Sequence, residues 1–460
     1  MKLSRFLVVF SLGMLVASFT AAGPSTAGLL CNVPSGAHGS IQEAIDDAGC
    51  AVIAVDSDTF VENLTISRNL TIRGAGVGET VLDAAGVGRG ASVDMGATVT
   101  LRGMTITGAN TGLGGAGILN YGVLTVEDSS VSGNTTSDTA GGGIDNYGTL
   151  TITNGSIANN HVAGMNGSGG AIFNSGGTIT VTNSTFSGNT TDYRSSVIHN
   201  QGGGSTTFRS VTVSGNDSGS NGGAILNVAG STVGIRYSTF ARNRAGAGPT
   251  SILNYGAANE FGVRNSIIVD GDGNSASCQG AIDSYGRSVY GDDSCSATAS
   301  DLASTDPMIG PLANNGGPVR THALLAGSPA IDLGFTEGPN CKGTDARGVP
   351  RPVGVRCDAG VYELVLCEGV LVNRVGTDGR DIIAGTSTRD GFLALAGNDD
   401  LFGRDGNDTF CAGAGNDDVY GQAGGDDLYG QGGDDLLDGG ADSDLCRGGP
   451  GDDTLVSCEA

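Results

Sequence analysis

Short apolar runs alternate with polar turns through most of the first half of the chain. From Ala51 to about Asp272, runs of Val, Ile and Thr are separated by Gly, Asn and Ser, which predicts short β-strands. An Ile-x-Asn motif recurs with steps of 26, 28, 26, 27 and 27 residues: Ile118/Asn120, Ile144/Asn146, Ile172/Asn174, Ile198/Asn200, Ile225/Asn227 and Ile252/Asn254. A period near 27 without a helix predicts a solenoid whose coils stack strand on strand.

Two columns of Asn follow from this alignment. One is the Asn of the motif, and the other comprises Asn134, Asn160, Asn189, Asn216 and Asn243. Stacked coils would place each column at one turn, where side-chain amides hydrogen-bond from coil to coil. We expect these Asn residues at turns that need a left-handed backbone, and the Ile residues of the motif inside the solenoid.

A shorter period governs the tail. From Gly376 to Val456 the chain reads as nine consecutive nonapeptides in unbroken register. Each has an Asp followed two residues later by a mostly apolar residue: Asp381/Ile383, Asp390/Phe392, Asp399/Leu401, Asp408/Phe410, Asp417/Val419, Asp426/Leu428, Asp435/Leu437, Asp444/Cys446 and Asp453/Leu455. The Gly-rich segment before each Asp allows a tight loop. The last three residues form a minimal strand whose central side chain points inward.

The tail resembles the hemolysin-type (RTX) calcium-binding repeats, which have the pattern G-G-x-G-x-D-x-U-x. The resemblance implies a parallel β-roll with two nonapeptides per coil and a cation between loops on the same side. Ca²⁺ suits such a site because it accepts six to eight oxygens, whereas Zn²⁺ prefers Cys or His. The residues expected at the metal are Gly376, Asp378, Asp381, Asp390, Gly397, Asp399, Gly403, Asp405, Gly406, Asp408, Gly415, Asp417, Gly421, Gly424, Asp426, Gly430, Gly433, Asp435, Gly439, Asp444, Gly448, Gly451 and Asp453.

The number of sites follows from the pairing of loops. Nine loops, each paired with the loop two nonapeptides later, allow at most seven sites. Thr388 and Asp442 replace the fourth-position Gly in two loops, so we expect roughly five to seven ions. The alternative is a disordered acidic linker. A linker, however, does not hold an apolar residue in nine-residue register.

Charge separates the tail from the rest of the chain. The net charge is −25, and Gly376 to Ala460 contributes −15 of it, from eighteen Asp and one Glu against four Arg. Such a field disfavours nucleic acid and anionic membranes as partners. It also opposes compaction of the tail without cations.

The 27-residue repeat, together with the segment Asn69 to Gly74, resembles right-handed parallel β-helix proteins of the pectate-lyase-like superfamily. Ahead of it, Ser40 to Ala48 has helical apolar spacing with Ser40 as N-cap and Glu43 completing a capping box, which predicts a helix over the open end. From Thr305 to Glu363 the period stops, as in the closing module of choice-of-anchor proteins. We expect an all-β chain: a right-handed parallel β-helix at 28–304, a closing module at 305–366 and a calcium-binding parallel β-roll at 367–460.

The N-terminus predicts export. Lys2 and Arg5 precede an apolar run from Phe6 to Phe19 and then small residues, which predicts a signal peptide at 1–22 and a run too short to span a membrane. Ten Cys residues fit an oxidising compartment. Proximity suggests the pairs Cys31–Cys50, Cys278–Cys295, Cys341–Cys357, Cys367–Cys411 and Cys446–Cys458; a zinc site is the competing interpretation, and no CxxC supports it.

No catalytic residues are assigned. The β-helix resemblance includes lyases, hydrolases and epimerases of polysaccharides, but Lys is limited to Lys2 and Lys342, and no coil Arg stands beside an evident Asp cluster. The closing module offers one candidate cluster: His322, Asp332, Asp345 and Asp358. Hydrogen-bonded polar groups of a packed cap account for the same residues.

The expected function is that of a secreted, extracellular calcium-binding protein. Its β-helix would be a non-catalytic surface, matrix or adhesion-type element, and its tail would fold on binding Ca²⁺. The further partner would be an extracellular polysaccharide or a cell-surface molecule. The alternative is a polysaccharide lyase or epimerase acting on uronate polymers, with the calcium roll as an accessory module.

Overall fold

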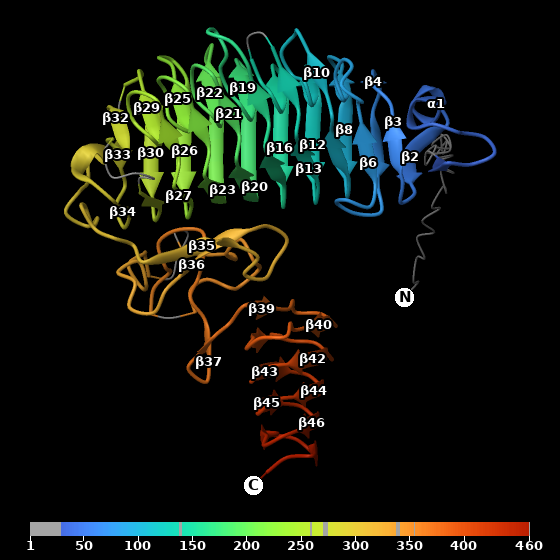
Figure 1. The fold of residues 1–460 in the computed structure, drawn as a ribbon, viewed down its shortest axis with the longest axis vertical. Helices are drawn as coiled ribbons and strands as arrows, with labels where there is room; N and C mark the ends of the chain where they lie inside the picture. Colours follow the sequence, from blue (N-terminus) through green and yellow to red (C-terminus); the bar gives the residue numbers. More distant parts are fainter. Residues whose placement is uncertain are drawn as a thin grey trace, which may run out of the picture.

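The computed structural model describes residues 29–137, 140–257, 260–269, 275–336, 341–353 and 355–459, and the proposed signal peptide at 1–22 lies outside them. Figure 1 shows a long solenoid, a module against its last coils and a narrow second solenoid that ends at the C-terminus. The described helices are α1 (Ile41–Asp46) and the 3₁₀ helix η2 (Asp293–Cys295). In this part of the chain, no helix is long and apolar enough to cross a membrane.

The long solenoid is a parallel β-helix, as predicted, and its described strands form three sheets. One sheet contains β4 (Leu64–Ile66), β7 (Ala91–Val93), β11 (Ile118–Asn120), β15 (Ile144–Asn146), β19 (Ile172–Ser175), β22 (Ile198–Gln201), β25 (Ile225–Asn227), β29 (Ile252–Asn254) and β32 (Cys278–Gly280). A second contains β10 (Asn110–Thr111), β14 (Thr135–Thr136), β18 (His161–Val162), β21 (Thr190–Thr191), β24 (Asp217–Ser218) and β28 (Arg244–Ala245). Each strand pairs in parallel with the strand one coil away, as β11 does with β15.

The third sheet runs the length of the β-helix. It contains β1 (Leu29–Val33), β2 (Cys50–Val55), β3 (Thr59–Val61), β5 (Leu70–Arg73), β6 (Val81–Asp83), β8 (Thr98–Arg102), β9 (Thr105–Thr107), β12 (Val123–Glu127), β13 (Ser130–Ser132), β16 (Thr149–Thr153), β17 (Ser156–Ala158), β20 (Thr178–Ser187), β23 (Ser205–Ser214), β26 (Thr232–Arg236), β27 (Thr239–Ala241), β30 (Phe261–Arg264), β31 (Ile267–Ile268), β33 (Asp283–Ser284) and β34 (Val289–Tyr290). The register stays constant from coil to coil, since Leu124 pairs with Leu150 and Leu150 with Ile179.

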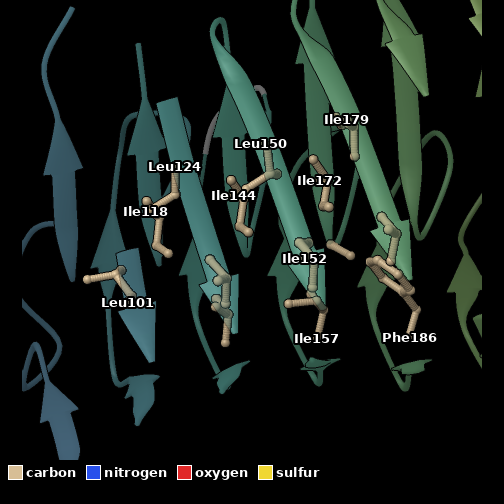
Figure 2. Packing of buried hydrophobic residues seen from close by; sticks show 14 of the residues in the cluster. Leu101, Ile118, Leu124, Ile144, Leu150, Ile152, Ile157, Ile172, Ile179 and Phe186 are labelled. Atoms are coloured by element: carbon tan, nitrogen blue, oxygen red, sulfur yellow. The ribbon is translucent and has the colours of Figure 1, made fainter. Parts of the chain in front are cut away.

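Apolar side chains fill the inside of the coils. The Ile residues of the Ile-x-Asn motif have no exposed surface, as predicted. In β16, Leu150 and Ile152 point inward while the alternating Thr residues are more exposed. Figure 2 shows these residues stacked with their equivalents in neighbouring coils. Burial of each such side chain contributes about 1.5–3 kcal/mol, so the core stabilises the β-helix without any ligand.

Both predicted Asn columns form hydrogen-bonded ladders. From Asn120 to Asn254, each Nδ2 donates to the Oδ1 of the next coil at 2.7–3.0 Å. From Asn134 to Asn243 the same bond is 2.9–3.0 Å long. Because an amide both donates and accepts, successive buried side chains satisfy one another.

The second Asn ladder lies at a left-handed turn, as expected. In the second column, the residue before each Asn has the positive φ, between 54° and 67°: Gly133, Asn159, Gly188, Gly215 and Arg242. The ladder amide must point inward to reach the next coil, so the preceding residue makes the turn. The ladder Asn residues themselves do not have positive φ.

The helix predicted at the N-terminal end is confirmed. Ser40 Oγ accepts the N–H of Glu43, and the Glu43 carboxylate accepts the N–H of Gly39, one residue before the position that a capping box uses. Arg68 of the first coils donates to three carbonyl oxygens at the helix end, those of Ala44, Ile45 and Asp47. These bonds satisfy carbonyls that a helix end leaves without partners.

The module at 305–366 packs along the side of the last coils. Its strands β35 (Ile309–Ala313) and β36 (Thr321–Leu324) form an antiparallel pair below β20 and β23 in Figure 1. His322 Nε2 bonds to Ser214 Oγ at 2.9 Å, and Arg320 donates to Ser187 Oγ at 2.9 Å. The module therefore binds outward-facing side chains of several coils.

Two buried ion pairs hold this module together. Arg347 pairs with Asp345 at 2.7 Å, and Arg351 pairs with Glu363 at 2.8 Å. Burial raises the pKa of Glu363 to about 7. Removing one partner of such a pair leaves a buried charge uncompensated. The Arg351 guanidinium also lies 4.8 Å from the centre of the Tyr237 ring, which joins the module to the β-helix.

The second solenoid follows the hairpin of β37 (Leu366–Cys367) and β38 (Val370–Leu371). One of its described sheets contains β39 (Arg374–Val375), β41 (Gly391–Leu393), β43 (Thr409–Ala414), β45 (Asp427–Gly432) and β47 (Leu445–Arg447). The other contains β40 (Ile382–Ala384), β42 (Asp400–Asp405), β44 (Asp418–Ala423), β46 (Leu436–Ala441) and β48 (Thr454–Val456). Two nonapeptides form one coil, as predicted, since Leu401 pairs with Val419. The inward residues are buried from Phe392 to Leu437, whereas Leu455 in the last strand is 50% exposed.

All ten Cys residues are paired, and the five pairs predicted from proximity are confirmed: Cys31–Cys50, Cys278–Cys295, Cys341–Cys357, Cys367–Cys411 and Cys446–Cys458. Cys367–Cys411 ties the segment before the roll to β43, and Cys446–Cys458 lies at the far end of the roll. The roll is therefore crosslinked at both ends, with uncrosslinked coils between.

Candidate calcium sites in the C-terminal roll

Loop conformation in the roll depends on Gly at the fourth position of the nonapeptide. Six of these glycines have φ between 120° and 152°: Gly397, Gly406, Gly415, Gly424, Gly433 and Gly451. A Cβ added to Gly415 would overlap the carbonyl oxygen of Gly397 in the adjacent coil. Asp442, which replaces Gly in the eighth loop, also has positive φ, at 81°. The loops thus stack with their backbones in contact, which other residues resist.

From Asp399 to Asp453, one oxygen of each repeat Asp belongs to a ladder between coils. Oδ1 accepts the backbone N–H of the Asp eighteen residues earlier, at 2.7–3.1 Å. One edge of the roll carries Asp381, Asp399, Asp417, Asp435 and Asp453, and the other carries Asp390, Asp408, Asp426 and Asp444. From Asp390 to Asp444 these side chains are at most 2% exposed. The ladder orients the seven carboxylates from Asp399 to Asp453.

The second oxygen of six of these carboxylates, Oδ2, is buried without a hydrogen-bond partner in the described residues: Asp399, Asp408, Asp417, Asp426, Asp435 and Asp444. Leaving such an atom unpaired is costly. Other oxygens converge on it: a Cβ added to Gly403 would lie 2.6 Å from Asp408 Oδ2 and 2.5 Å from the Gly421 carbonyl oxygen. Around Asp408, the loops thus direct two oxygens at one place, with no side-chain hydrogen-bond donor among the described residues.

The electrostatics of these carboxylates favour a bound cation. Burial raises the pKa of Asp408 and Asp417 to about 6 and that of Asp426 to about 7. Burial also raises the pKa of Asp399, Asp435 and Asp444. A divalent cation would supply both the missing positive charge and the missing ligand. The donors are carboxylate and carbonyl oxygens, which Ca²⁺ prefers, so the residues fit the predicted metal.

The first two loops of the roll are different. Asp390 Oδ2 accepts the N–H and the hydroxyl of Thr386 at 2.6 and 2.9 Å, and Asp381 Oδ2 accepts the same groups of Thr377 at the same distances. Sequence reasoning included both Asp residues and overlooked the two Thr residues. The signal was available, because Thr stands four residues before the Asp only in these two nonapeptides. Two other predicted residues, Asp378 and Asp405, have exposed side chains.

The cluster proposed in the closing module comprises His322, Asp332, Asp345 and Asp358. The structure does not assemble it around the His. His322 bonds to the carbonyl oxygen of Gly310 and the hydroxyl of Ser214, while Asp345 pairs with Arg347. Burial lowers the pKa of His322. These side chains therefore hold the module together through hydrogen bonds and an ion pair.

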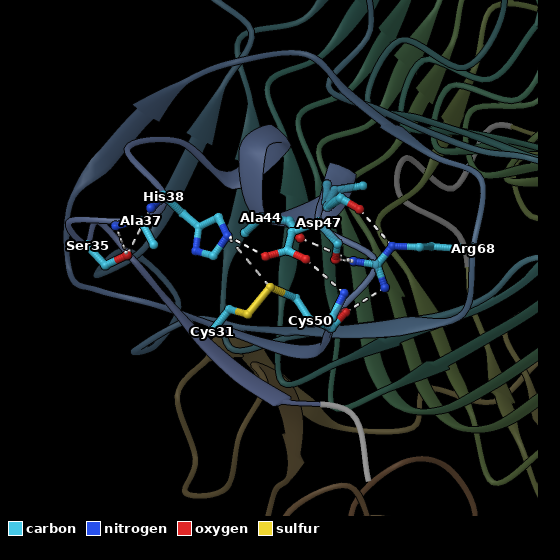
Figure 3. Close-up of a disulfide and its surroundings, with 10 residues drawn as sticks. Cys31, Ser35, Ala37, His38, Ala44, Asp47, Cys50 and Arg68 are labelled. Atoms are coloured by element: carbon cyan, nitrogen blue, oxygen red, sulfur yellow. Dashed lines mark hydrogen bonds and ion pairs between the residues drawn. A yellow bond between two sulfur atoms is a disulfide. The ribbon is translucent and has the colours of Figure 1, made fainter. Parts of the chain in front are cut away.

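A second group of metal-binding residue types lies at the N-terminal end. Figure 3 shows Cys31, His38, Asp47 and Cys50 together. The two sulfurs are bonded to each other and so offer no thiolate, the form that binds metals. His38 bonds to Asp47 at 3.1 Å. The group is a crosslink with a hydrogen-bonded pair beside it.

A matched pair of Gly substitutions tests the site. Gly403→Ala puts a methyl group among the oxygens around Asp408, so we expect the calcium concentration at half-saturation to rise about 10–100-fold, the usual cost of disturbing groups that orient metal ligands. Gly432→Ala is the control, because its Cβ would meet its nearest neighbour, the Gly413 carbonyl oxygen, at an ordinary 3.7 Å. Isothermal titration calorimetry measures both. Equal affinities in the two variants would contradict the site.

His199 in β22 gives a prediction about pH. Burial, with the Arg194 guanidinium adding to it, lowers its pKa from 6.5 to about 4, and neither ring nitrogen has a partner in the described residues. The unfolded chain therefore binds the proton more tightly, and stability is lost as pH falls below 6.5. Leu226 fills the equivalent position one coil later. His199→Leu should remove roughly 2 kcal/mol of this loss at pH 5 and little at pH 8, measured by urea unfolding. Equal acid sensitivity in both proteins would refute this.

Comparisons with known proteins agree with the roll. A family model for the RTX calcium-binding nonapeptide repeat matches residues 375–410, 392–419 and 420–455. The crystal structure of pectate lyase Pel9A is similar with a TM-score of 0.42 and 14% identity, over 74% of this chain and 98% of that chain. A mutant of the PL6 family alginate lyase AlyGC gives 0.27 and 12%, over 92% and 72%. No curated protein matches. The chain is thus a parallel β-helix followed by RTX repeats, which bind calcium.

Proposed function

We propose that the chain is an exported protein whose roll folds on binding extracellular Ca²⁺ and whose β-helix is a non-catalytic surface for a polysaccharide or cell-surface partner. The observation that carries the calcium part is the set of six buried Oδ2 atoms without donors. The five disulfides support an oxidising compartment outside the cytoplasm.

Calcium binding is coupled to folding because the oxygens that would bind the metal belong to different coils. Asp408 Oδ2 and the carbonyl oxygen of Gly421 belong to adjacent coils, and they come together only when the coils stack. The Oδ1 ladder holds each carboxylate in place, as outer-shell hydrogen bonds do in other metal sites. Ca²⁺ would supply positive charge between the coils. The binding free energy is then also folding free energy.

The non-catalytic part of the proposal is supported by the pairing of polar side chains. A cavity of about 900 Å³ lies between the last coils and the closing module and is lined by Arg242, Asp292, Asp293 and Asp306, among others. Arg242 donates to the Gly310 carbonyl oxygen, and Asp292 accepts the N–H of Ser277. These bonds hold the cavity wall together. The cavity is nevertheless the place where a lyase or epimerase would act, since its size suits a ligand.

Calcium titration of the full chain tests the first part. In EGTA the roll should be expanded, and far-UV circular dichroism should gain β-structure as Ca²⁺ rises through about 10⁻⁴ to 10⁻³ M. Mg²⁺ serves as the control, because it demands a tighter octahedral site. A spectrum unchanged by calcium up to about 10⁻² M, roughly tenfold above that range, would refute the proposal.

Incubation with pectate and alginate tests the second part. With Ca²⁺ present, we expect no rise in ultraviolet absorbance from unsaturated ends and no change in the uronate composition seen by NMR. Activity that Arg242→Gln abolishes would establish the enzyme alternative and place it in the cavity. Activity that survives this substitution would still disprove the non-catalytic proposal.

A further inference from the structure

The first repeat Asp on one edge of the roll is satisfied entirely by protein groups. Asp390 Oδ1 accepts from Asn373 Nδ2 at 2.9 Å and pairs with Arg374 Nη2 at 3.1 Å. Its Oδ2 accepts the N–H and hydroxyl of Thr386. The Asp390 side chain is 1% exposed and that of Arg374 is 18% exposed. The carboxylate therefore has three hydrogen-bond donors and a positive charge beside it.

The next Asp on this edge lacks those donors. Asp408 Oδ1 accepts only the backbone N–H of Asp390, and its Oδ2 has no partner in the described residues. The loop before Asp390 also differs from the later loops in its backbone φ angle. The residue four before the Asp has positive φ in the open loops, at Leu395, Arg404, Gly413, Gln422, Gln431, Gly440 and Gly449. Thr386 does not, so its N–H reaches its own Asp.

The donors to Asp390 are held by the closing module. The carbonyl oxygen of Val372 accepts from the Tyr362 hydroxyl at 3.0 Å, and the N–H of Val372 donates to Val365 at 3.1 Å. The Cys367–Cys411 disulfide crosslinks the same segment to β43. Asn373 and Arg374 thus follow directly after a residue fixed by a folded module, and none of these contacts uses a calcium loop.

We propose that Arg374, with Asn373 and Thr386, is a fixed cation that replaces Ca²⁺ at the first coil. Asp390 is then a structural residue, as is Asp381 through Thr377, and the metal ladder begins at Asp399 and Asp408. Pairing the remaining loops leaves three sites along the edge from Asp399 to Asp453 and two along the edge from Asp408 to Asp444, five in all. This proposal rests on calcium-coupled folding of the roll.

Hydrogen exchange of the full chain, read by mass spectrometry with EGTA and with saturating Ca²⁺, tests the ordered first coil. We expect the amides from Asn373 to Phe392 to be protected in both conditions, and those from Asp417 to Asp435 only with calcium. Calcium dependence in both segments would overturn the fixed cation and leave the proposed function intact. Absence of calcium dependence from both would overturn the proposed function as well.

A substitution with a matched control tests Arg374 itself. Arg374→Gln leaves the Asp390 charge buried without its partner, so protection of 373–392 in EGTA should be lost and half-saturating Ca²⁺ should rise about tenfold. Arg404→Gln is the control, because Gln422 and Gln431 stand at the same loop position; its half-saturation should stay within about twofold. Unchanged values for Arg374→Gln would reject the role of this residue.

Stoichiometry gives an independent measurement. Equilibrium dialysis of the full chain should find five tightly bound calcium ions. Seven ions would mean that the loops at Asp381 and Asp390 bind metal despite their Thr donors, and would overturn the proposal. Replacing Thr386 by Gly, the residue found at this position in three later loops, in the Arg374→Gln chain should add one ion. An unchanged number in that double variant would also count against it.

Discussion

Pairing of buried polar groups between successive coils determines what each solenoid needs from its surroundings. An Asn amide donates and accepts, so the ladder from Asn120 to Asn254 is complete within the protein. An Asp carboxylate only accepts. In the roll the backbone N–H satisfies Oδ1, and Oδ2 is left over in every loop from Asp399 to Asp444. The same stacking therefore gives a β-helix whose amide ladder is complete and a roll whose carboxylates each leave one oxygen available to a cation.

At the end of a solenoid, the terminal coil has no neighbouring coil on one side. Its polar groups therefore need hydrogen-bond partners from outside the repeat. At the start of the β-helix, α1 covers the first coil. Arg68 donates hydrogen bonds to the carbonyl oxygens at the end of α1. At the start of the roll, Asn373 and Arg374 supply the donors that a preceding coil would have supplied to Asp390. In both places an Arg side chain contributes: Arg68 donates to several backbone carbonyl oxygens, and Arg374 pairs with one carboxylate.

The features predicted correctly from the sequence were those that recur in every coil. The two periods located the Asn ladders, the inward Ile and apolar columns and the loops of the roll, because each coil places equivalent residues at equivalent positions. Contacts outside the repeat were not predictable in this way. His322 bonds to Ser214, which lies 108 residues away and in another module. Thr386 was overlooked because it stands at the second Gly of the pattern, a position that varies among Thr, Leu, Arg, Gly and Gln in this chain, and the backbone shows that Thr gives a different loop there.

The spacing of the coils sets how strongly the roll depends on cations. Neighbouring strands lie about 4.8 Å apart, and two unit charges at that separation repel by about 3–4 kcal/mol at an effective dielectric constant of 20. Each nonapeptide buries one apolar residue, which contributes about 1.5–3 kcal/mol. The summed repulsion energy of several such carboxylate pairs along each edge exceeds this contribution. Protonation relieves the repulsion as pH falls, because burial raises the pKa of Asp426 to about 7 and that of Asp408 and Asp417 to about 6. Under the proposed function, a bound cation would offset this repulsion at neutral pH in the coils between the two terminal disulfides.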